Sequence, residues 1–385
     1  MTLNLIADRI VGGKIYPALT QAPDKNFDQH YPYTVPLRLQ EYCVQHQVPL
    51  TIYSIEEQCP ANTFYPIGIG FFDFSIDYIE LLSLPVRNRL HLGDFKLLLY
   101  YHEGDNPVNI KQQLDSLCNK HGLHPDCYVF VSGNTAAKSL SNFVYFADFE
   151  LWYYQRNLNS PALKVHREPR EREFTVLNRL HKSWRALAMA DLRHNGILDN
   201  SYWSYCETGE FADTECAIRI DDISGLRTRT KKFLQSAPYV SDELDHDKRN
   251  DHRTLIPKYH VNSYCNIVME THFDIGSSGT FLSEKTFKPI KHGQMFFVAG
   301  PAGSLQVLRD LGYRVFDSVL DNRYDLESNA TQRWMTLTRS IFFTQPDLPQ
   351  LFELCRADIE HNQQLFQSSK AGRLNTLIKE INEHY

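Results

Sequence analysis

Short apolar runs that end in polar, glycine-containing turns constrain the fold of this chain more than any other feature. The run over residues 95–101 (FKLLLYY) is almost continuously apolar, as expected for a strand buried on both faces of a parallel sheet. It ends in the polar turn 102–105 (HEGD), a segment with helical spacing follows over 109–121, and a second apolar run occupies 127–132 (CYVFVS). Strand, loop, helix and strand in this order predict a doubly wound sheet, in which ligands bind at the carboxyl ends of the strands.

A second alternation of this kind follows a charged, proline-containing segment at 164–172 (KVHREPRER). It consists of strand-like runs at 174–177, 265–270, 295–299 and 315–316, with helix-like runs at 183–194 and 284–292 among them. The chain is therefore predicted to be α/β, with two Rossmann-like domains in series. We place the domains at 1–160 and 161–350, with largely helical sequence over 351–385.

Charge and cysteine usage exclude several classes of protein. A net charge of −6 and an isoelectric point of about 6.2 argue against a protein that coats nucleic acid by bulk electrostatics. No stretch approaches the roughly 20 apolar residues of a membrane span, and no secretory signal is evident at the N-terminus. The eight cysteines form no C-x-x-C pair, which favours free thiols and a cytoplasmic protein.

The stretch 264–303 carries the most informative pattern. A strand ends in an acid, Glu270, and a loop rich in glycine and serine follows at 276–279. Ser283 is placed to cap the next helix, whose first turn contains Lys285. A helix N-terminus attracts anions, whereas a lysine at this end opposes the helix dipole unless a bound anion compensates it. This local conflict is typical of a functional site.

The same stretch resembles the donor-binding domain of GT-B glycosyltransferases, and most closely the fucosyltransferase-like pattern. In that pattern an acid-Asn pair precedes a loop, "EK" opens a helix, and the helix leads to P-I-x-x-G. Here Glu270 stands at the acid, Thr271 replaces the Asn, and Glu284-Lys285 stand at the EK. The resemblance implies a donor site in which Glu270 and Glu284 bind ribose hydroxyls or orient Lys285.

A second segment, 176–205, is similar to the strand-helix segment of the same family, including glycosyltransferase-type proteins common in phage genomes. Asn178 closes the strand, and the resemblance implies that Arg185 in the following helix contacts the nucleotide diphosphate. Arg179 and Lys182 are further, weaker candidates for this contact.

The resemblance implies a glycosyltransferase that takes a hexosyl or fucosyl group from a nucleotide-diphosphate sugar, its co-substrate, and needs no other cofactor. Arg185, Lys285 and the helix at Ser283 would neutralise the departing diphosphate. The adjacent acids Asp221 and Asp222 do not form the spaced D-x-D of a metal-bound donor, and the charged run 242–252 reads as a solvated loop. We therefore expect a metal-independent transfer, and the resemblance implies that it inverts the anomeric carbon.

The catalytic base is expected from the N-terminal domain, which would bind the acceptor and face the donor domain across a cleft in the GT-B manner. Glu103 is the first choice because it follows the apolar run 95–101, at the carboxyl end of that strand. The side chains that compete with it are His102, Asp105, Asp73 and Asp77.

Two other functions remain open. The acceptor is a glycan, a small molecule or modified DNA, and the last of these would make the chain a phage-type DNA-base glycosyltransferase. Alternatively, the chain is a non-catalytic protein that binds sugar nucleotides or glycans. The GT-B resemblance also implies that the helices of 351–385 pack back towards the N-terminal domain.

Overall fold

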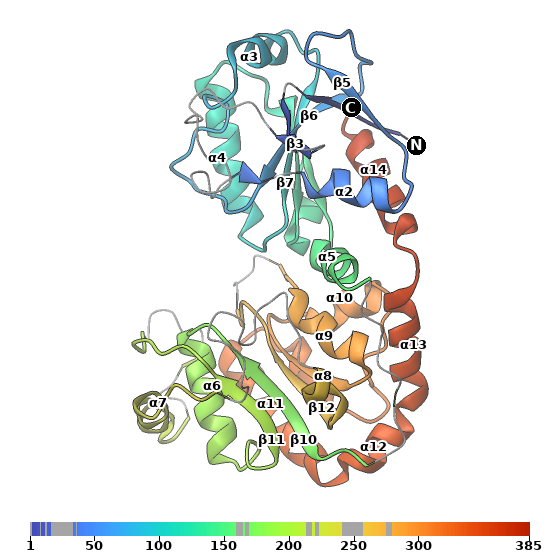
Figure 1. The fold of residues 1–385 in the computed structure, drawn as a ribbon. Coiled ribbons are helices and arrows are strands. Elements are labelled where there is room, and N and C mark those ends of the chain that lie inside the picture. The colour runs from blue at the N-terminus through green and yellow to red at the C-terminus, as the bar shows by residue number, and fades with distance from the viewer. Residues whose placement is uncertain are drawn as a thin grey trace. The chain divides into compact units, whose positions relative to one another are not determined.

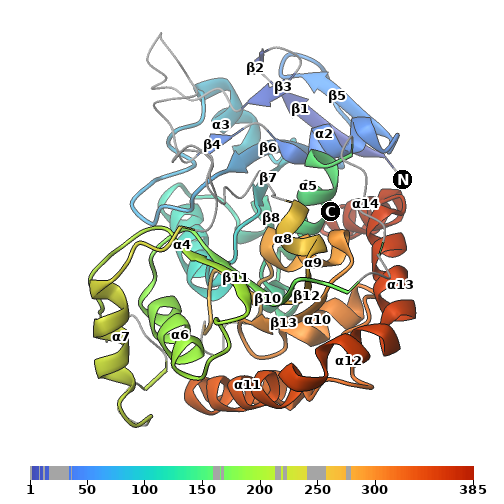
Figure 2. The ribbon, with the colours of Figure 1, turned by 60° about the horizontal axis from the view of Figure 1, so that its bottom comes forward.

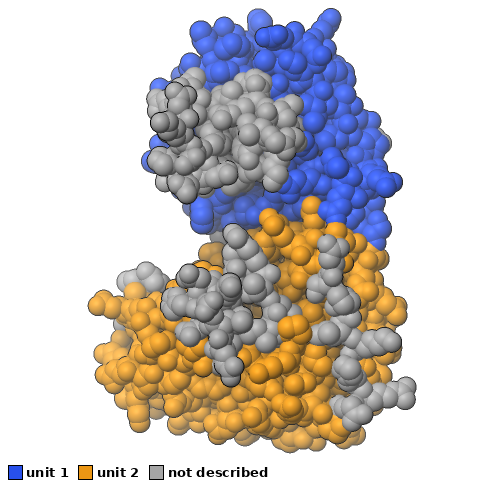
Figure 3. Space-filling view, viewed as in Figure 1, with its two compact units in different colours: residues 1–148, 277–281, 369–385 blue, residues 149–276, 282–368 orange. Residues whose placement is uncertain are grey.

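The computed structural model describes residues 2–7, 9–11, 14–16, 34–35, 37–158, 165, 169–212, 218–219, 223–240, 257–274 and 279–385. Asp221, Asp222, the run 242–252 and residues 276–278 of the glycine- and serine-rich loop lie outside them. The chain forms two compact units, coloured in Figure 3: unit 1 holds 1–148, 277–281 and 369–385, and unit 2 holds 149–276 and 282–368. The first change of unit thus falls at 148/149 and the last at 368/369, compared with predicted boundaries at 160/161 and 350/351.

Unit 1 is built on a parallel sheet with one short antiparallel strand at its side. The strand order is β5 (Leu50–Ser54), β1 (Leu3–Ala7), β6 (Thr63–Ile69), β7 (Lys96–Tyr101), β8 (Tyr128–Ser132) and β9 (Phe143–Tyr145), and β4 (Thr34–Val35) pairs antiparallel with β6. A separate hairpin joins β2 (Arg9–Val11) and β3 (Lys14–Tyr16). The helical segments are α2 (Arg38–Gln45), α3 (Leu84–His91), α4 (Pro107–Lys120), η1 (Pro125–Cys127), η2 (Thr135–Ser139) and α14 (Ala371–Glu383), and α5 (Asp148–Arg156) begins at the unit boundary.

The expected buried strand at 95–101 is confirmed as β7, which lies in the middle of this sheet with β6 and β8 as its neighbours. Its apolar side chains pack into one core with those of β6, β8, α3 and α4. The strand β6 escaped the sequence analysis because Pro66 stands in its middle, opposite Leu98 of β7. Proline normally keeps to edge strands, since it donates no ladder hydrogen bond.

Unit 2 is built on a smaller parallel sheet with the order β11 (Ser201–Tyr205), β10 (Arg172–Asn178), β12 (Ser263–Met269) and β13 (Met295–Ala299). Its helical segments are α6 (Ser183–His194), α7 (Leu226–Gln235), α8 (Pro257–Val261), α9 (Glu284–His292), α10 (Ser304–Asp310), η6 (Asn322–Leu326), α11 (Ala330–Thr344), η7 (Gln345–Asp347), α12 (Leu348–Leu354) and α13 (Arg356–Gln367).

The connections of unit 2 run in opposite directions from the centre of its sheet. The crossover from β10 through α6 leads outward to β11, and the crossover from β12 through α9 leads outward to β13. Because such crossovers are right-handed, the two helices cover opposite faces of the sheet, as Figures 1 and 2 show. Both helices begin at the carboxyl edge of the strands, at the point where the strand order reverses.

The sequence patterns gave the bounds of several elements of unit 2 correctly. The helices predicted at 183–194 and 284–292 and the strand predicted at 295–299 are confirmed as α6, α9 and β13. The strand predicted at 315–316 is wrong, since the structure assigns no strand there and Phe316 has a φ of 64°, a left-handed conformation that a strand does not accommodate. Each unit is thus α/β with a parallel sheet, as expected.

No helix among the described residues is long and apolar enough to cross a membrane. The cysteines of the described residues are free thiols, as the sequence predicted.

Asp148 is the buried anchor of unit 1. Its carboxylate accepts hydrogen bonds from Arg38 Nη1 at 2.9 Å, Tyr42 Oη at 3.0 Å and Tyr100 Oη at 2.5 Å. These bonds tie α2 and β7 to the start of α5, and the Asp148 side chain is only 2% exposed. Buried carboxylates require such partners, because an unpaired charge is costly inside a protein.

We predict that Asp148→Ala destabilises unit 1 by about 3 kcal/mol, because the Arg38 guanidinium loses its carboxylate inside the protein. Urea unfolding followed by fluorescence measures the change. The control is Glu383→Ala, which removes an exposed ion pair with Lys379 of the same unit and should change the free energy of unfolding by less than about 0.5 kcal/mol. Equal stability of the two variants would contradict an anchoring role for Asp148.

Candidate functional site

The carboxyl edge of the unit 2 sheet brings most of the predicted donor-site residues together. The strand order reverses between β10, which ends at Asn178, and β12, which ends at Met269 directly before Glu270. In open α/β sheets this switch point is where ligands bind, since the loops on its two sides diverge and leave a crevice. The predicted residues of α6 and α9 lie in the first turns of the helices that follow these loops.

The Glu270 carboxylate is fully buried and receives two hydrogen bonds on each oxygen. Its Oε1 accepts from the Ser283 N–H at 3.1 Å and from Thr286 Oγ1 at 2.6 Å. Its Oε2 accepts from Ser283 Oγ at 2.6 Å and from the Thr271 N–H at 3.1 Å. The carboxylate therefore binds the end of β12 to the beginning of α9.

Ser283 is confirmed as the N-cap of α9, since its Oγ accepts from the Lys285 N–H at 3.4 Å. The Lys285 ammonium group lies 3.1 Å from Ser283 Oγ, 3.2 Å from Thr271 Oγ1 and 3.2 Å from Glu284 Oε1. The Lys285 side chain is 30% exposed and that of Glu284 is 6% exposed. Lys285 is therefore held against the first turn of the helix while it still reaches solvent.

Glu284 is ionised in this setting. Burial works to raise the pKa of its carboxyl group, but the ammonium groups of Lys285 and Lys288 outweigh burial and hold the pKa below its ordinary value. Its carboxylate contacts the Lys285 ammonium group, and the ribose-binding or orienting role expected for Glu284 stays a prediction.

Arg185 is buried, with 3% of its surface exposed, and binds main-chain carbonyl groups. Its Nη2 donates to Met269 O at 3.2 Å and to Glu270 O at 2.6 Å, and its Nη1 donates to Leu180 O at 3.5 Å. Burial lowers the pKa of its guanidinium from the ordinary value, and the carboxylates of Glu270 and Glu284 oppose this shift. The direct diphosphate contact expected for Arg185 stays a prediction.

Asn178 at the end of β10 and two residues of the following loop, Arg179 and Lys182, complete the edge. The side-chain amide of Asn178 is buried, and neither its nitrogen nor its oxygen makes a hydrogen bond with the part of the chain that the structure describes. Arg179 is half-buried, and its carbonyl accepts from the Glu207 N–H at 3.0 Å. Lys182 donates from Nζ to Thr271 O at 2.9 Å.

The sequence analysis gave no role to Thr286, whose hydroxyl completes the bonds to Glu270. Its place three residues after the cap Ser283, in the same first turn, is the signal that could have identified it. Lys182 was judged a weaker candidate than Arg185, although it reaches the same turn at the end of β12.

Glu103, the predicted base, lies in unit 1 directly after β7 and His102. Its side chain is 31% exposed, and its Oε1 lies 3.5 Å from His102 Nε2. Arg38 Nη2 lies 3.1 Å from the same nitrogen, and burial and this guanidinium lower the pKa of His102 well below its ordinary value. Burial and the Arg38 guanidinium therefore favour the neutral form of His102 beside Glu103.

The competing acids of unit 1 have local structural partners. Tyr101 donates its phenol hydrogen to Asp105, and Asp73 accepts from the N–H and Oγ of Ser75 at 2.8 and 2.6 Å. These bonds fix the turns in which the two acids lie.

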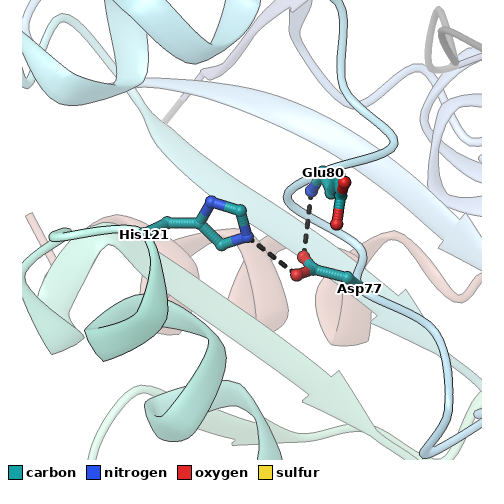
Figure 4. A group of neighbouring side chains, drawn as sticks. All are labelled: Asp77, Glu80 and His121. Carbon is teal, nitrogen blue, oxygen red and sulfur yellow. Dashed lines mark hydrogen bonds and ion pairs between the residues drawn. The ribbon is translucent and has the colours of Figure 1, made fainter.

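Asp77 belongs to a cluster with Glu80 and His121 that Figure 4 shows. Its carboxylate accepts from the Glu80 N–H at 2.9 Å, lies 2.8 Å from His121 Nε2, and lies 2.7 Å from Lys120 Nζ. Burial works to raise the pKa of Asp77, but the hydrogen bonds from Lys120 and His121 lower it overall. The Lys120 ammonium group already neutralises the Asp77 carboxylate. We therefore interpret the cluster as a capped turn that is hydrogen-bonded to the end of α4.

The comparisons with known proteins identify no family. No protein-family model and no curated protein matches the sequence. Among solved structures the chain is similar to a glycosyltransferase from Rickettsia africae ESF-5, with 10% identity and a TM-score of 0.35, over 93% of this chain and 84% of that chain.

We predict that Glu270→Gln lowers the stability of unit 2 by about 3 kcal/mol or more, because the new amide places a donor against donors and removes a buried charge beside Arg185. Urea unfolding gives the free energy, and hydrogen exchange reports the first amides of α9. Glu327→Gln, an exposed acid of the same unit, serves as the control. A stable Glu270→Gln protein with unchanged exchange would show that the carboxylate does not hold the two elements together.

Proposed function

We propose that the protein is a glycosyltransferase whose unit 2 binds a nucleotide-diphosphate sugar at the carboxyl edge of its sheet. One observation carries the proposal. The helices α6 and α9 both begin at the switch point, where the Lys285 side chain is partly exposed beside the Glu270 carboxylate, which already accepts four hydrogen bonds. Helix N-termini and a fixed ammonium group together favour a phosphate-bearing ligand.

The chemistry of the transfer requires this charge arrangement. The bond between the anomeric carbon and the β-phosphate oxygen breaks, the acceptor oxygen forms a new bond to that carbon, and the acceptor proton passes to a base. The leaving diphosphate gains negative charge as the bond breaks, and preorganised cations stabilise that charge most in the transition state. The Lys285 ammonium group and the positive end of the α9 dipole are suited to this task, so the proposal requires no metal ion.

Unit 1 supplies the acceptor side in this proposal, in the facing arrangement of GT-B enzymes, and Glu103 is the base. Direct displacement inverts the anomeric carbon, so the base must act from the side opposite the diphosphate. The position of Glu103 shortly after the central strand β7 and its partial exposure support this choice.

A panel of uridine, guanosine and thymidine diphosphate sugars tests the proposal. At least one should raise the melting temperature of the protein and should be hydrolysed slowly, as mass spectrometry detects. Binding without hydrolysis or transfer to any acceptor would favour the non-catalytic binding protein. Binding of none would contradict the proposal.

Once the panel has identified a donor, we predict that Lys285→Ala lowers kcat by about 10²- to 10³-fold with a smaller change in KM. The reason is that the contact between Lys285 and the diphosphate strengthens as the diphosphate leaves. Steady-state kinetics measure both constants. Lys231→Ala removes the same charge from the exposed side of α7 and should leave them unchanged. Normal turnover by Lys285→Ala would place the diphosphate elsewhere.

We predict that Glu103→Gln keeps donor affinity and lowers transfer by about 10²- to 10⁴-fold, since glutamine preserves the shape and removes the basicity. Calorimetry with the donor and a transfer assay separate the two effects, with Glu80→Gln as an exposed control from the same unit. Unchanged transfer would move the base to another residue, whereas lost donor affinity would make Glu103 a binding residue.

A further inference from the structure

The geometry points to Lys182, together with Lys285, as the pair of cations that holds the diphosphate, and to Arg185 as the residue that positions the loops around them. This inference rests on the proposed function, because it names the groups that would meet the phosphates of the donor. It differs from the expectation drawn from the sequence, in which Arg185 contacts the diphosphate itself.

The two ammonium groups meet at one residue of unit 2. Lys182 Nζ donates to the main-chain oxygen of Thr271 at 2.9 Å, and Lys285 Nζ donates to Oγ1 of the same residue at 3.2 Å. Lys182 comes from the loop after β10 and Lys285 from the helix after β12, so the pair bridges the two sides of the switch point. The Glu284 carboxylate, 3.2 Å from Lys285 Nζ, balances one of these two positive charges. The pair keeps a net positive charge, which an anion bound beside both ammonium groups would neutralise.

The helix ends add to this positive charge. Lys182 is the N-cap of α6, which has 12 residues, and among the described residues its side chain makes no capping bond to that helix. Lys285 lies in the first turn of α9, which has nine residues. Each helix therefore directs its positive end, and a lysine, towards the same edge of the sheet.

Asn178 gives an independent indication that this edge binds a ligand. It closes β10, four residues before Lys182, and its amide is buried at 2% exposure with no hydrogen bond to any described residue. Buried amides nearly always have partners, because an unsatisfied group of this kind is costly. A polar ligand at the switch point would supply hydrogen-bonding groups to it.

Arg185 has a different task, since its bonds are made to the protein. Its guanidinium binds the carbonyls of Met269 and Glu270, directly before Thr271, and that of Leu180, two residues before Lys182. The arginine thus ties the loop that carries Lys182 to the strand end that carries Thr271. It acts through the two lysines and needs no contact with the phosphates.

Calorimetry with UDP, GDP, the matching monophosphates and inorganic pyrophosphate tests the inference on the full chain. Lys182→Ala should weaken binding of the preferred nucleoside diphosphate by about 10- to 100-fold, the effect of losing one charge-assisted contact, and should weaken the monophosphate less. Lys182→Arg should recover part of the lost affinity. The control variant Lys231→Ala, at an exposed position, should bind with the affinity of the wild type.

The dependence of affinity on salt separates the two roles. Removing a cation that faces the ligand reduces this dependence, so Lys182→Ala should show a shallower response to salt than the wild type. Arg185→Met should lower affinity but retain the wild-type response, because Arg185 does not face the ligand. The assignment would be overturned if Arg185→Met showed a shallower dependence of affinity on salt while Lys182→Ala kept the wild-type dependence. If Arg185→Met does not fold, the Lys182 variants decide the question.

The remaining outcomes distinguish this inference from the proposed function. Wild-type affinity of Lys182→Ala for a nucleoside diphosphate that the native protein binds would overturn the role of Lys182 and leave the glycosyltransferase proposal standing. Binding of pyrophosphate that depends on Lys182, without binding of any nucleotide sugar, would support the lysine pair and contradict the glycosyltransferase. If neither pyrophosphate nor a nucleoside diphosphate binds, both are overturned.

Discussion

The buried carboxylate of Glu270 is the constraint on which the candidate site of unit 2 depends. It stands at the end of β12 and accepts hydrogen bonds from both the N–H and the hydroxyl of Ser283, the residue that caps α9. Because one carboxylate serves the strand end and the helix cap, the beginning of α9 is fixed at the carboxyl edge of the sheet. The ammonium group of Lys285 is fixed with it, through its contacts with Ser283 and Thr271.

Four hydrogen bonds and a nearby opposite charge together stabilise this carboxylate inside the protein. Arg185 is buried beside it and binds the Glu270 carbonyl at 2.6 Å, so the two buried ions compensate one another within unit 2. In the proposed site, buried ions of this kind, whose hydrogen bonds are made to the protein, position the surrounding elements. The proposal assigns contact with the ligand to charged groups that still reach solvent, such as Lys285.

Sequence patterns correctly predicted the helices and strands whose local amino-acid preferences agree with their place in the tertiary structure. The bounds of α6 and α9 followed from helical spacing, and for α9 also from the capping Ser283. The structure adds that Gly293 ends α9 with a positive φ of 66°, which glycine tolerates at a helix end. The strand β6 was missed because Pro66 contradicts a central strand, and only the pairing with β1 and β7 reveals it. Tertiary packing overrode the local rule at that position.

The candidate site was predicted as a set of residues, but the roles within it depend on partners that sequence spacing does not reveal. The carbonyls bound by Arg185 Nη2 lie 84 and 85 residues further along the chain, so only the fold shows that Arg185 binds main-chain groups of the protein itself. The same geometry bears on the resemblance proposed from the sequence, in which Thr271 stands where the fucosyltransferase-like pattern has Asn. Lys182 binds the main-chain oxygen, which any residue supplies, and Lys285 binds a side-chain oxygen, which threonine supplies as a hydroxyl where asparagine has a carbonyl. The substitution therefore keeps both acceptors between the two lysines, and the departure from the pattern leaves the arrangement of charge intact.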